Sequence, residues 1–233
     1  MTPDSVSYNA VNRSTKELPG TFITLEGVDG SGKTTQADAL ARILRKTGQR
    51  VLLSREPGGT PVAERIRDIL LDREIESMAW STEVLLYLAS RAEHVAGLLR
   101  PALERGEVVI CDRFLDSTLA YQAFGREGGG RSVTEALEAI RRANALATGG
   151  LGPELTFLLD LDPVEGLGRT AAAGRAPDRL EGEGTTFLER VRQGFLSLAD
   201  SEPDRIHVIP AGGSVTDVTE EIAEHTLTWL QRK

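Results

Sequence analysis

Short apolar runs alternate along the chain with longer segments in which apolar residues recur every three or four positions. The short runs predict buried strands, whereas the three-to-four spacing predicts helices that each bury one face. Glycine and proline clusters separate many of these segments and favour turns. The expected strands are 21–25, 51–53, 108–110, 155–161 and 206–209, and the expected helices are about 33–47, 62–71, 81–105, 117–124, 133–147 and 215–230.

Strands separated by helices favour a parallel sheet, because crossover connections place helices on both of its faces. The predicted fold class is therefore α/β, a three-layer sandwich with a five-stranded parallel sheet flanked by helices. The length of 233 residues suits one domain. Residues 1–19 are polar and are expected to form a flexible N-terminal extension, and 20–233 are expected to form the single domain.

Composition and charge narrow the class of protein. The net charge of −8 argues against a general nucleic-acid binder, because no basic excess is available to displace counterions. No apolar stretch approaches the ~18 residues of a membrane helix, so no membrane partner is expected. Cys111 is the single cysteine, which excludes an intrachain disulfide and suits a reducing compartment. A cytoplasmic location is the expectation.

The strongest chemical signal is a glycine-rich loop between the first strand and the first helix. It matches the Walker A pattern of P-loop NTPases, in which glycines let backbone N–H groups converge on phosphate oxygens. The following helix N-terminus adds partial positive charge. We expect Lys33 to reach the outer phosphates of ATP and the Thr34 hydroxyl to ligate Mg²⁺. The expected ATP-binding residues here are Gly27, Val28, Asp29, Gly30, Ser31, Gly32, Lys33, Thr34 and Thr35.

Asp112 follows the third strand, where P-loop proteins place an acidic residue near the metal. It is the second expected Mg²⁺ residue, acting through water, since this ion keeps several of its own waters. The alternative is that Asp112 caps the next helix.

Three more motifs carry a resemblance to a known family. Arg55-Glu56-Pro57-Gly58-Gly59-Thr60 ends the second strand, 112–122 follows the third, and Tyr87-Leu88-Ala89-Ser90-Arg91 lies on a helix. Both strand ends lie at the carboxyl edge of the sheet, where open α/β folds bind ligands. Together with the loop at 27–35, these motifs resemble those of bacterial thymidylate kinases, from about 21 to 230. The resemblance implies direct in-line phosphorylation of dTMP to dTDP with ATP·Mg²⁺, and a homodimer.

The resemblance also assigns the arginines at the strand ends. It implies that Arg113 binds the acceptor phosphate and bridges it toward the transferred phosphoryl group, and that Arg55 helps to position the acceptor. Guanidinium groups suit this task because their planar forks pair bidentately with phosphate and stay charged. The alternative for Arg113 is a surface charge after a strand.

Tyr87 and Arg91 are one helical turn apart and therefore share a face. The resemblance implies that Tyr87 stacks on thymine and that Arg91 pairs with the base edge. Tyr87 departs from the Phe of relatives, so its hydroxyl needs a partner; core packing is the alternative for this residue. The resemblance also implies that the helix after the third strand reads the base and packs on the deoxyribose, through Ser117, Thr118, Tyr121 and Gln122. Glu26 is expected to hydrogen-bond within the site, and Asp29 to lie near the acceptor phosphate or its metal.

The segment 169–183 is rich in Gly, Ala and Arg and is expected to form a mobile lid. Positioned cations supply much of the catalysis in phosphoryl transfer. The resemblance is to the bacterial type, in which lid arginines act because Gly30 stands where some eukaryotic relatives have arginine. We expect Arg175 and Arg179 to be catalytic and Arg169 to lie nearer the ATP base. The alternative is that each is a solvated loop arginine.

Two other functions stay open at this level. A different nucleoside monophosphate kinase or a deoxynucleoside kinase would keep the loop and lid but need another base pocket. A non-catalytic nucleotide-binding P-loop protein is the second alternative, against which the intact Lys33, Thr34, Asp112 and Arg113 count.

Overall fold

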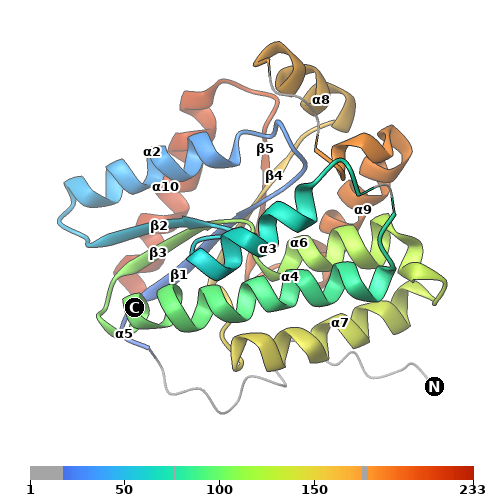
Figure 1. Cartoon of the computed structure of the whole chain (residues 1–233). Helices are drawn as coiled ribbons and strands as arrows, with labels where there is room; N and C mark the ends of the chain where they lie inside the picture. Colours follow the sequence, from blue (N-terminus) through green and yellow to red (C-terminus); the bar gives the residue numbers. More distant parts are fainter. Residues whose placement is uncertain (1–17, 76, 175–177) are drawn as a thin grey trace, which may run out of the picture.

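The computed structural model describes residues 18–75, 77–174 and 178–233, in which five parallel strands form one sheet (Figure 1). The order across the sheet is β2-β3-β1-β4-β5. β1 is central, all of its residues are buried, and it leads directly into the glycine-rich loop. The predicted α/β class and the five-stranded parallel sheet are confirmed. The strands are β1 (Thr21–Glu26), β2 (Val51–Arg55), β3 (Val108–Asp112), β4 (Leu155–Asp160) and β5 (Ile206–Pro210).

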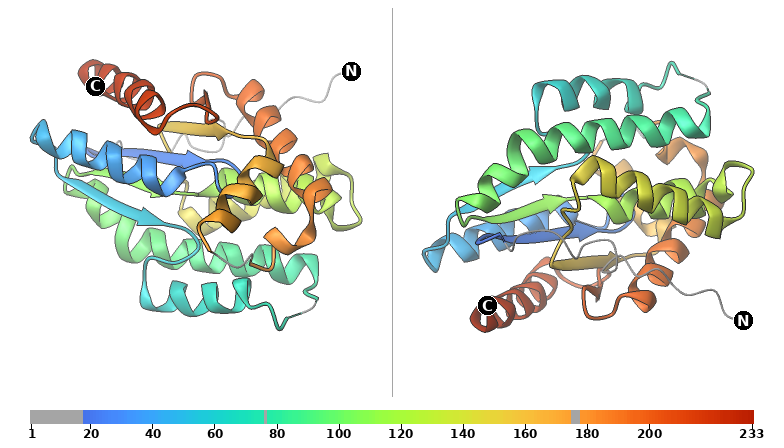
Figure 2. Two further views of the ribbon diagram at one scale, coloured as in Figure 1. Left: turned by 90° about the horizontal axis from the view of Figure 1, so that it is seen from above. Right: turned by 90° about the horizontal axis from the view of Figure 1, so that it is seen from below.

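Helices cover both faces of the sheet. Figure 2 shows α2 and α10 on one side and α4 and α7 on the other, with α3 outside α4. Within the described ranges, no helix combines the length and the apolar character needed to cross a membrane. The α-helices are α2 (Lys33–Lys46), α3 (Pro61–Leu71), α4 (Trp80–His94), α5 (Arg100–Glu104), α6 (Leu115–Thr118), α7 (Val133–Thr148), α8 (Pro163–Ala172), α9 (Thr185–Ser201) and α10 (Val215–Arg232).

The structure refines two of the expected helices. The predicted helix 81–105 is α4 followed by a π-helical stretch, Val95–Leu99, and then α5. The predicted helix 117–124 is α6 followed by a second π-helical stretch, Leu119–Gly125. Such π-helical turns are rare and often occur at functional sites, and the second one carries two residues of the expected base pocket.

Helices α8 and α9, between β4 and β5, were not delimited from the sequence. Two glycines within α8 lower its helix propensity, so its local signal is weak; Asp162 caps it by accepting from the backbone N–H of Val164 at 2.8 Å. The predicted lid, 169–183, therefore begins inside α8. Part of it, 175–177, lies outside the described residues, as does 1–17 of the predicted extension.

Local sequence also explains where α3 begins. Thr60 ends the turn after β2, and its Oγ1 accepts a hydrogen bond from the N–H of Ala63 at 3.3 Å, while Pro61 occupies the first helical turn. A capped start with proline at this position is the favoured arrangement for a helix N-terminus. Helix α3 is thus fixed directly behind the turn that carries Arg55.

The core side of α2 provides a test of the packing. Leu40 is 0% exposed and Leu146, on α7, is 87% exposed. We expect Leu40→Ala to lower the free energy of unfolding by about 2–5 kcal/mol, because the deletion leaves a cavity in a close-packed core. Leu146→Ala should change it by less than about 0.5 kcal/mol. Chemical denaturation of both variants measures this, and equal effects would contradict the assigned burial.

Candidate active site

A pocket of about 320 Å³ opens at the carboxyl ends of β1, β2 and β3. It joins the glycine-rich loop to residues of α3, α4 and the segment after β3. Its walls are polar on the loop side and partly apolar toward α3 and α4. The lining residues are Asp29, Gly30, Lys33, Thr34, Arg55, Glu56, Pro57, Arg67, Leu71, Tyr87, Asp112, Arg113, Ser117, Tyr121, Gln122, Asp178 and Leu180.

The glycine-rich loop has the backbone that the sequence predicts. Gly27, Gly30 and Gly32 have φ of 136°, 78° and 93°, a region that side-chain-bearing residues rarely adopt. Gly30 also lies against the backbone of Gly166 in α8, where a Cβ would collide with the carbonyl oxygen. The loop therefore curls tightly before α2, which leaves backbone N–H groups at the helix N-terminus for an anion.

Lys33 spans this loop from the first turn of α2. Its Nζ donates to the carbonyl oxygen of Val28 at 2.7 Å and to Ser31 Oγ at 3.4 Å. Burial, together with the nearby charge of Arg113, lowers the pKa of Lys33 to about 8. A phosphate would supply the negative charge that this buried ammonium requires.

The two expected magnesium residues are in contact. Thr34 Oγ1 donates to Asp112 Oδ2 at 2.6 Å, although the residues are far apart in sequence. No cluster of three or more His, Cys, Asp or Glu suited to a metal occurs among the described residues. One hydroxyl and one carboxylate at a phosphate loop fit Mg²⁺, which binds few protein ligands and otherwise uses phosphate oxygens and water.

Arg113 lies between the loop and the segment after β3. Its Nη1 donates to the carbonyl oxygen of Gly27 at 2.8 Å, and its Nη2 donates to Asp29 Oδ1 at 2.7 Å. Ser117 Oγ and Tyr121 Oη accept further bonds from it at 3.2 and 3.3 Å. Burial alone would lower the pKa of Arg113, but the Asp29 carboxylate outweighs it and the pKa lies well above the ordinary value. Arg113 is therefore a fixed cation at the centre of the pocket.

The backbone of Arg113 is unusual as well. Its φ is 70°, in the left-handed region that is uncommon for residues other than glycine. Such conformations persist where the surroundings over-determine them and cluster at functional sites. Here the N–H of Arg113 donates to the carbonyl oxygen of Leu25 at 2.9 Å, and the next N–H, of Phe114, donates to Glu26 Oε1 at 2.7 Å.

Glu26 thus holds the turn that aims Arg113. Its second oxygen accepts from Ser117 Oγ at 2.6 Å, and a role of Glu26 in binding substrate stays a prediction. Burial and the neighbouring Asp116 carboxylate raise the pKa of Glu26 to about 8. Glu26 is 1% exposed and does not line the pocket, so it shapes the site from behind.

Arg55 and Arg67 face the pocket from β2 and α3. Arg55 makes a two-bond ion pair with Glu64 at 3.0 and 3.1 Å. Arg67, which the sequence analysis missed, donates to the carbonyl oxygen of Pro57 at 2.8 Å, and burial and the charge of Arg55 lower its pKa. Arg67 is four residues after Ala63 and three before Leu70, both of which are buried, so it lies on the inner face of α3. This spacing is the feature of the sequence from which Arg67 could have been predicted.

Arg91 is buried and is not among the residues that line the pocket. The side chain is 2% exposed, and it donates to Glu56 Oε2 at 2.8 Å and to the carbonyl oxygen of Phe114 at 3.0 Å. A third bond reaches Asn144 Oδ1 at 2.6 Å. Arg91 therefore ties the turn after β2 to the turn after β3; its role at the base edge stays a prediction.

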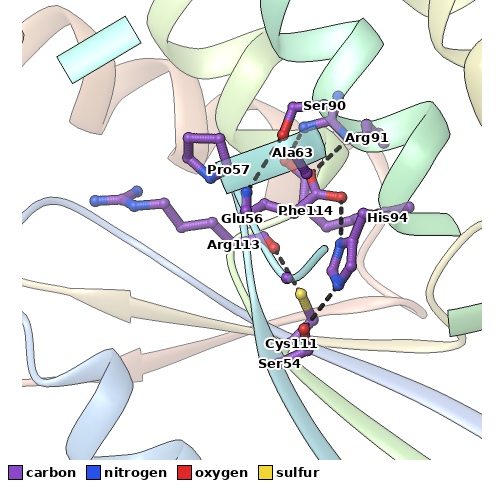
Figure 3. Close-up of polar contacts among 12 residues, drawn as sticks. Ser54, Glu56, Pro57, Ala63, Ser90, Arg91, His94, Cys111, Arg113 and Phe114 are labelled. Carbon is purple, nitrogen blue, oxygen red and sulfur yellow. Dashed lines mark hydrogen bonds and ion pairs between the residues drawn. The ribbon is translucent and has the colours of Figure 1, made fainter. Parts of the chain in front are cut away.

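Glu56 is shared with a histidine. His94 Nδ1 lies 3.0 Å from Glu56 Oε1, and its Nε2 lies 2.7 Å from Ser54 Oγ (Figure 3). Both side chains are buried. Both carboxylate oxygens of Glu56 thus have a partner on α4, Arg91 for one and His94 for the other. These bonds fix the position of Glu56, which directly follows Arg55.

The expected base-binding residues divide into two groups. Tyr87, Ser117, Tyr121 and Gln122 line the pocket. Tyr121 Oη donates to Asp29 Oδ2 at 3.2 Å, which adds a second bond to the loop carboxylate. Thr118 is 1% exposed and does not line the pocket, so its substrate-binding role also stays a prediction.

The lid arginines occupy different places. Arg169 donates to the carbonyl oxygen of Ala211, after β5, and to Glu165. Arg175 lies outside the described residues. Arg179 donates to the carbonyl oxygen of Leu70 at 2.9 Å and pairs with Glu83 at 2.7 Å, so its guanidinium faces α3 and α4 in this conformation. Reaching the transferred phosphoryl group would require the lid to move.

Glu83 is the second residue that the sequence analysis missed. It is 1% exposed in the first turn of α4 and binds Arg126, Arg179 and Gln122. Burial alone would raise its pKa, but the bonds from Arg126 and Gln122 outweigh it and the pKa is lowered. The available signal was its position one helical turn before Tyr87, on the same face of α4.

Comparison with known proteins identifies the family. The family model for thymidylate kinase matches residues 25–222. A thymidylate kinase of Deinococcus radiodurans is 52% identical over 87% of this chain and 94% of its own, and that of Geobacter sulfurreducens is 47% identical over 92% and 100%. The crystal structure of thymidylate kinase from Ehrlichia chaffeensis superposes with a TM-score of 0.68 at 35% identity, covering 89% of this chain and 98% of the other. The chain, in which Arg113 lies between the phosphate loop and the pocket, therefore belongs to the thymidylate kinase family.

Proposed function

We propose that this protein phosphorylates dTMP to dTDP with ATP·Mg²⁺ as donor. The observation that carries the proposal is the position of Arg113, which contacts Gly27 and Asp29 of the phosphate loop and also Ser117 and Tyr121 of the acceptor pocket. A cation shared by two substrate sites can bind the acceptor phosphate and the transferred group together. The family membership supports the same activity.

The reaction is a direct in-line transfer. Lys33 and the loop N–H groups bind the outer phosphates of ATP, and Arg55 and Arg113 hold the acceptor phosphate whose oxygen attacks. Thr34 and, through water, Asp112 would hold Mg²⁺, which would supply positive charge to the phosphate oxygens. Holding both nucleotides in line converts a two-body encounter into one positioned step, and the lid excludes water. No protein nucleophile is required.

Acceptor choice tests the proposal most directly. With ATP and Mg²⁺ we expect dTMP to be converted to dTDP, thymidine to be left unphosphorylated and dUMP to react more slowly, with products resolved by chromatography. Lys33→Ala should lower kcat by about 100-fold or more, because it removes a cation that stabilises the transition-state charge. Preference for another monophosphate would assign a different kinase, and saturable binding without turnover would assign a non-catalytic protein.

Arg179 provides a test of the lid. We expect Arg179→Ala to lower kcat at least about tenfold, through loss of a cation over the site, while the KM for ATP changes less than about threefold because the loop residues remain. Arg190→Ala is the matched control, since Arg190 contacts Gly125 and Glu127 instead of the pocket. A normal kcat in the Arg179 variant would show that the assignment is wrong.

We also propose a homodimer. The apolar side chains of Val62 and Ile69 on α3 and Leu85 on α4 are 51%, 45% and 62% exposed, and the two helices pack side by side. Exposed apolar residues on neighbouring helices suit a two-fold interface, in which the same surface pairs with itself. A cytoplasmic location is proposed as well, because the reaction uses ATP and the chain has one cysteine and thus no intrachain disulfide.

Light scattering tests the dimer. The wild type should have twice the chain mass of 25.2 kDa. Leu85→Lys should shift the mass toward the monomer, because a charge in an interface core must be desolvated. Val164→Lys, at a residue 61% exposed on α8, should not. A monomeric wild type, or a Leu85→Lys variant that stays dimeric, would contradict this surface.

A further inference from the structure

Among the described residues, the side-chain amide of Gln122 is hydrogen-bonded through its nitrogen but not through its oxygen. Gln122 is 1% exposed and lines the acceptor pocket. Its Nε2 donates to Glu83 Oε1 at 2.9 Å. Its Oε1 is buried and has no hydrogen-bond partner among the residues that the structure describes. A buried amide oxygen without a partner is costly, so it points to a ligand that donates a hydrogen bond there.

The chemistry of Glu83 decides which way this amide faces. An ionised carboxylate only accepts hydrogen bonds, so the NH₂ group of Gln122 must face it and the oxygen must face away. Glu83 is kept ionised by Arg126, which donates to both of its oxygens at 3.2 and 3.1 Å, and by Arg179 at 2.7 Å. The orientation therefore follows from charge, independently of how the amide atoms are assigned.

The backbone of Gln122 is fixed from the same helical turn. Trp80 Nε1 donates to the carbonyl oxygen of Gln122 at 2.8 Å. Trp80 and Glu83 both lie in the first turn of α4, and Gln122 lies in the π-helical stretch Leu119–Gly125. Backbone and side chain of one pocket residue are thus held by two residues of α4 that do not line the pocket.

We propose that Glu83 is a positioning residue for base recognition. It presents the oxygen of Gln122 to the pocket as a fixed acceptor, which pairs with a ring N–H of the base. Thymine and uracil carry such an N–H between their two carbonyl groups, whereas cytosine carries an acceptor nitrogen at the same place. Glu83 thereby selects dioxopyrimidine monophosphates against cytidine monophosphates. This inference rests on the proposed function for the identity of the acceptor site.

Glu83→Gln removes the charge that fixes the amide, because a glutamine at 83 can either donate to Gln122 or accept from it. We expect the dissociation constant of dTMP to rise about tenfold or more, as for one lost hydrogen bond to a buried group, while that of dCMP changes less than about threefold. Calorimetry, with competition for the weaker nucleotide, measures both. Glu93→Gln, the same change at an exposed residue of α4 that does not line the pocket, should leave both unchanged.

Glu83 also binds Arg126 and Arg179, so its loss can affect folding. Glu83→Asp keeps the negative charge for both arginines while drawing the oxygens away from Gln122 by one methylene group. Circular dichroism and ATP affinity establish which variants are folded. If Glu83→Gln does not fold, the discrimination between dTMP and dCMP in Glu83→Asp decides: a loss supports the inference and wild-type discrimination overturns it.

Combining the Glu83 substitutions with Gln122→Leu distinguishes a role in positioning Gln122 from a role in stabilising the fold. In Gln122→Leu the acceptor is gone, so a Glu83 substitution should cause no further loss of discrimination. An equal further loss in that background, or a parallel weakening of dTMP and dCMP in the single variant, would overturn the inference. If the wild type binds dTMP in preference to dCMP and the Glu83 variants lose that preference, but the wild type does not phosphorylate dTMP, the proposed function alone would fail.

Discussion

The site depends on gathering positive charge at one edge of a sheet in a chain whose net charge is −8. Lys33, Arg55, Arg67 and Arg113 all line one pocket, and they would repel one another without compensation. Burial and repulsion from Arg113 already lower the pKa of Lys33 to about 8. Carboxylates placed beside individual cations solve this problem, because each one holds an arginine in position and offsets its charge until a phosphate arrives.

The carboxylates also determine where the cations point. Asp29 in the loop holds Arg113, and Glu64 in α3 holds Arg55 by two bonds. Glu56, which lines the pocket, holds the buried Arg91, which in turn donates to the carbonyl oxygen of Phe114. The turns after β2 and β3 are therefore joined through one buried ion pair and one hydrogen bond to the backbone, and loss of the ion pair would leave an unpaired buried charge. An acidic chain can bind two anionic nucleotides because its acidic residues orient the basic ones.

The sequence was sufficient wherever a contact is local or a motif fixes the geometry. The glycine-rich loop, its lysine and the strand before it follow from spacing and residue type, and the predicted metal pair Thr34–Asp112 is in contact. It was insufficient where a contact joins distant elements. Glu83 was missed because its partner Gln122 belongs to another element. Arg67 was missed because its partner is a backbone carbonyl oxygen, that of Pro57, which no side-chain pattern reveals. Arg91 lies on the same face of α4 as Tyr87, as its spacing predicts, but only Tyr87 lines the pocket. Helical spacing indicates which residues share a face, and it does not indicate how deeply each side chain is buried.

Helix α4 shows why that depth matters. Trp80, Glu83, Tyr87, Arg91 and His94 follow one another at intervals of three or four, so they form one stripe facing the site. Trp80 binds the backbone of Gln122, and Glu83 binds the side-chain amide of Gln122. Tyr87 lines the pocket. Arg91 binds the turn after β3, and His94 binds Ser54 of β2. Such a stripe would be apolar if α4 only covered the sheet. Its polar residues instead set the relative position of the base pocket and the phosphate-binding turns, so a shift of this one helix would disturb base recognition and phosphate alignment together.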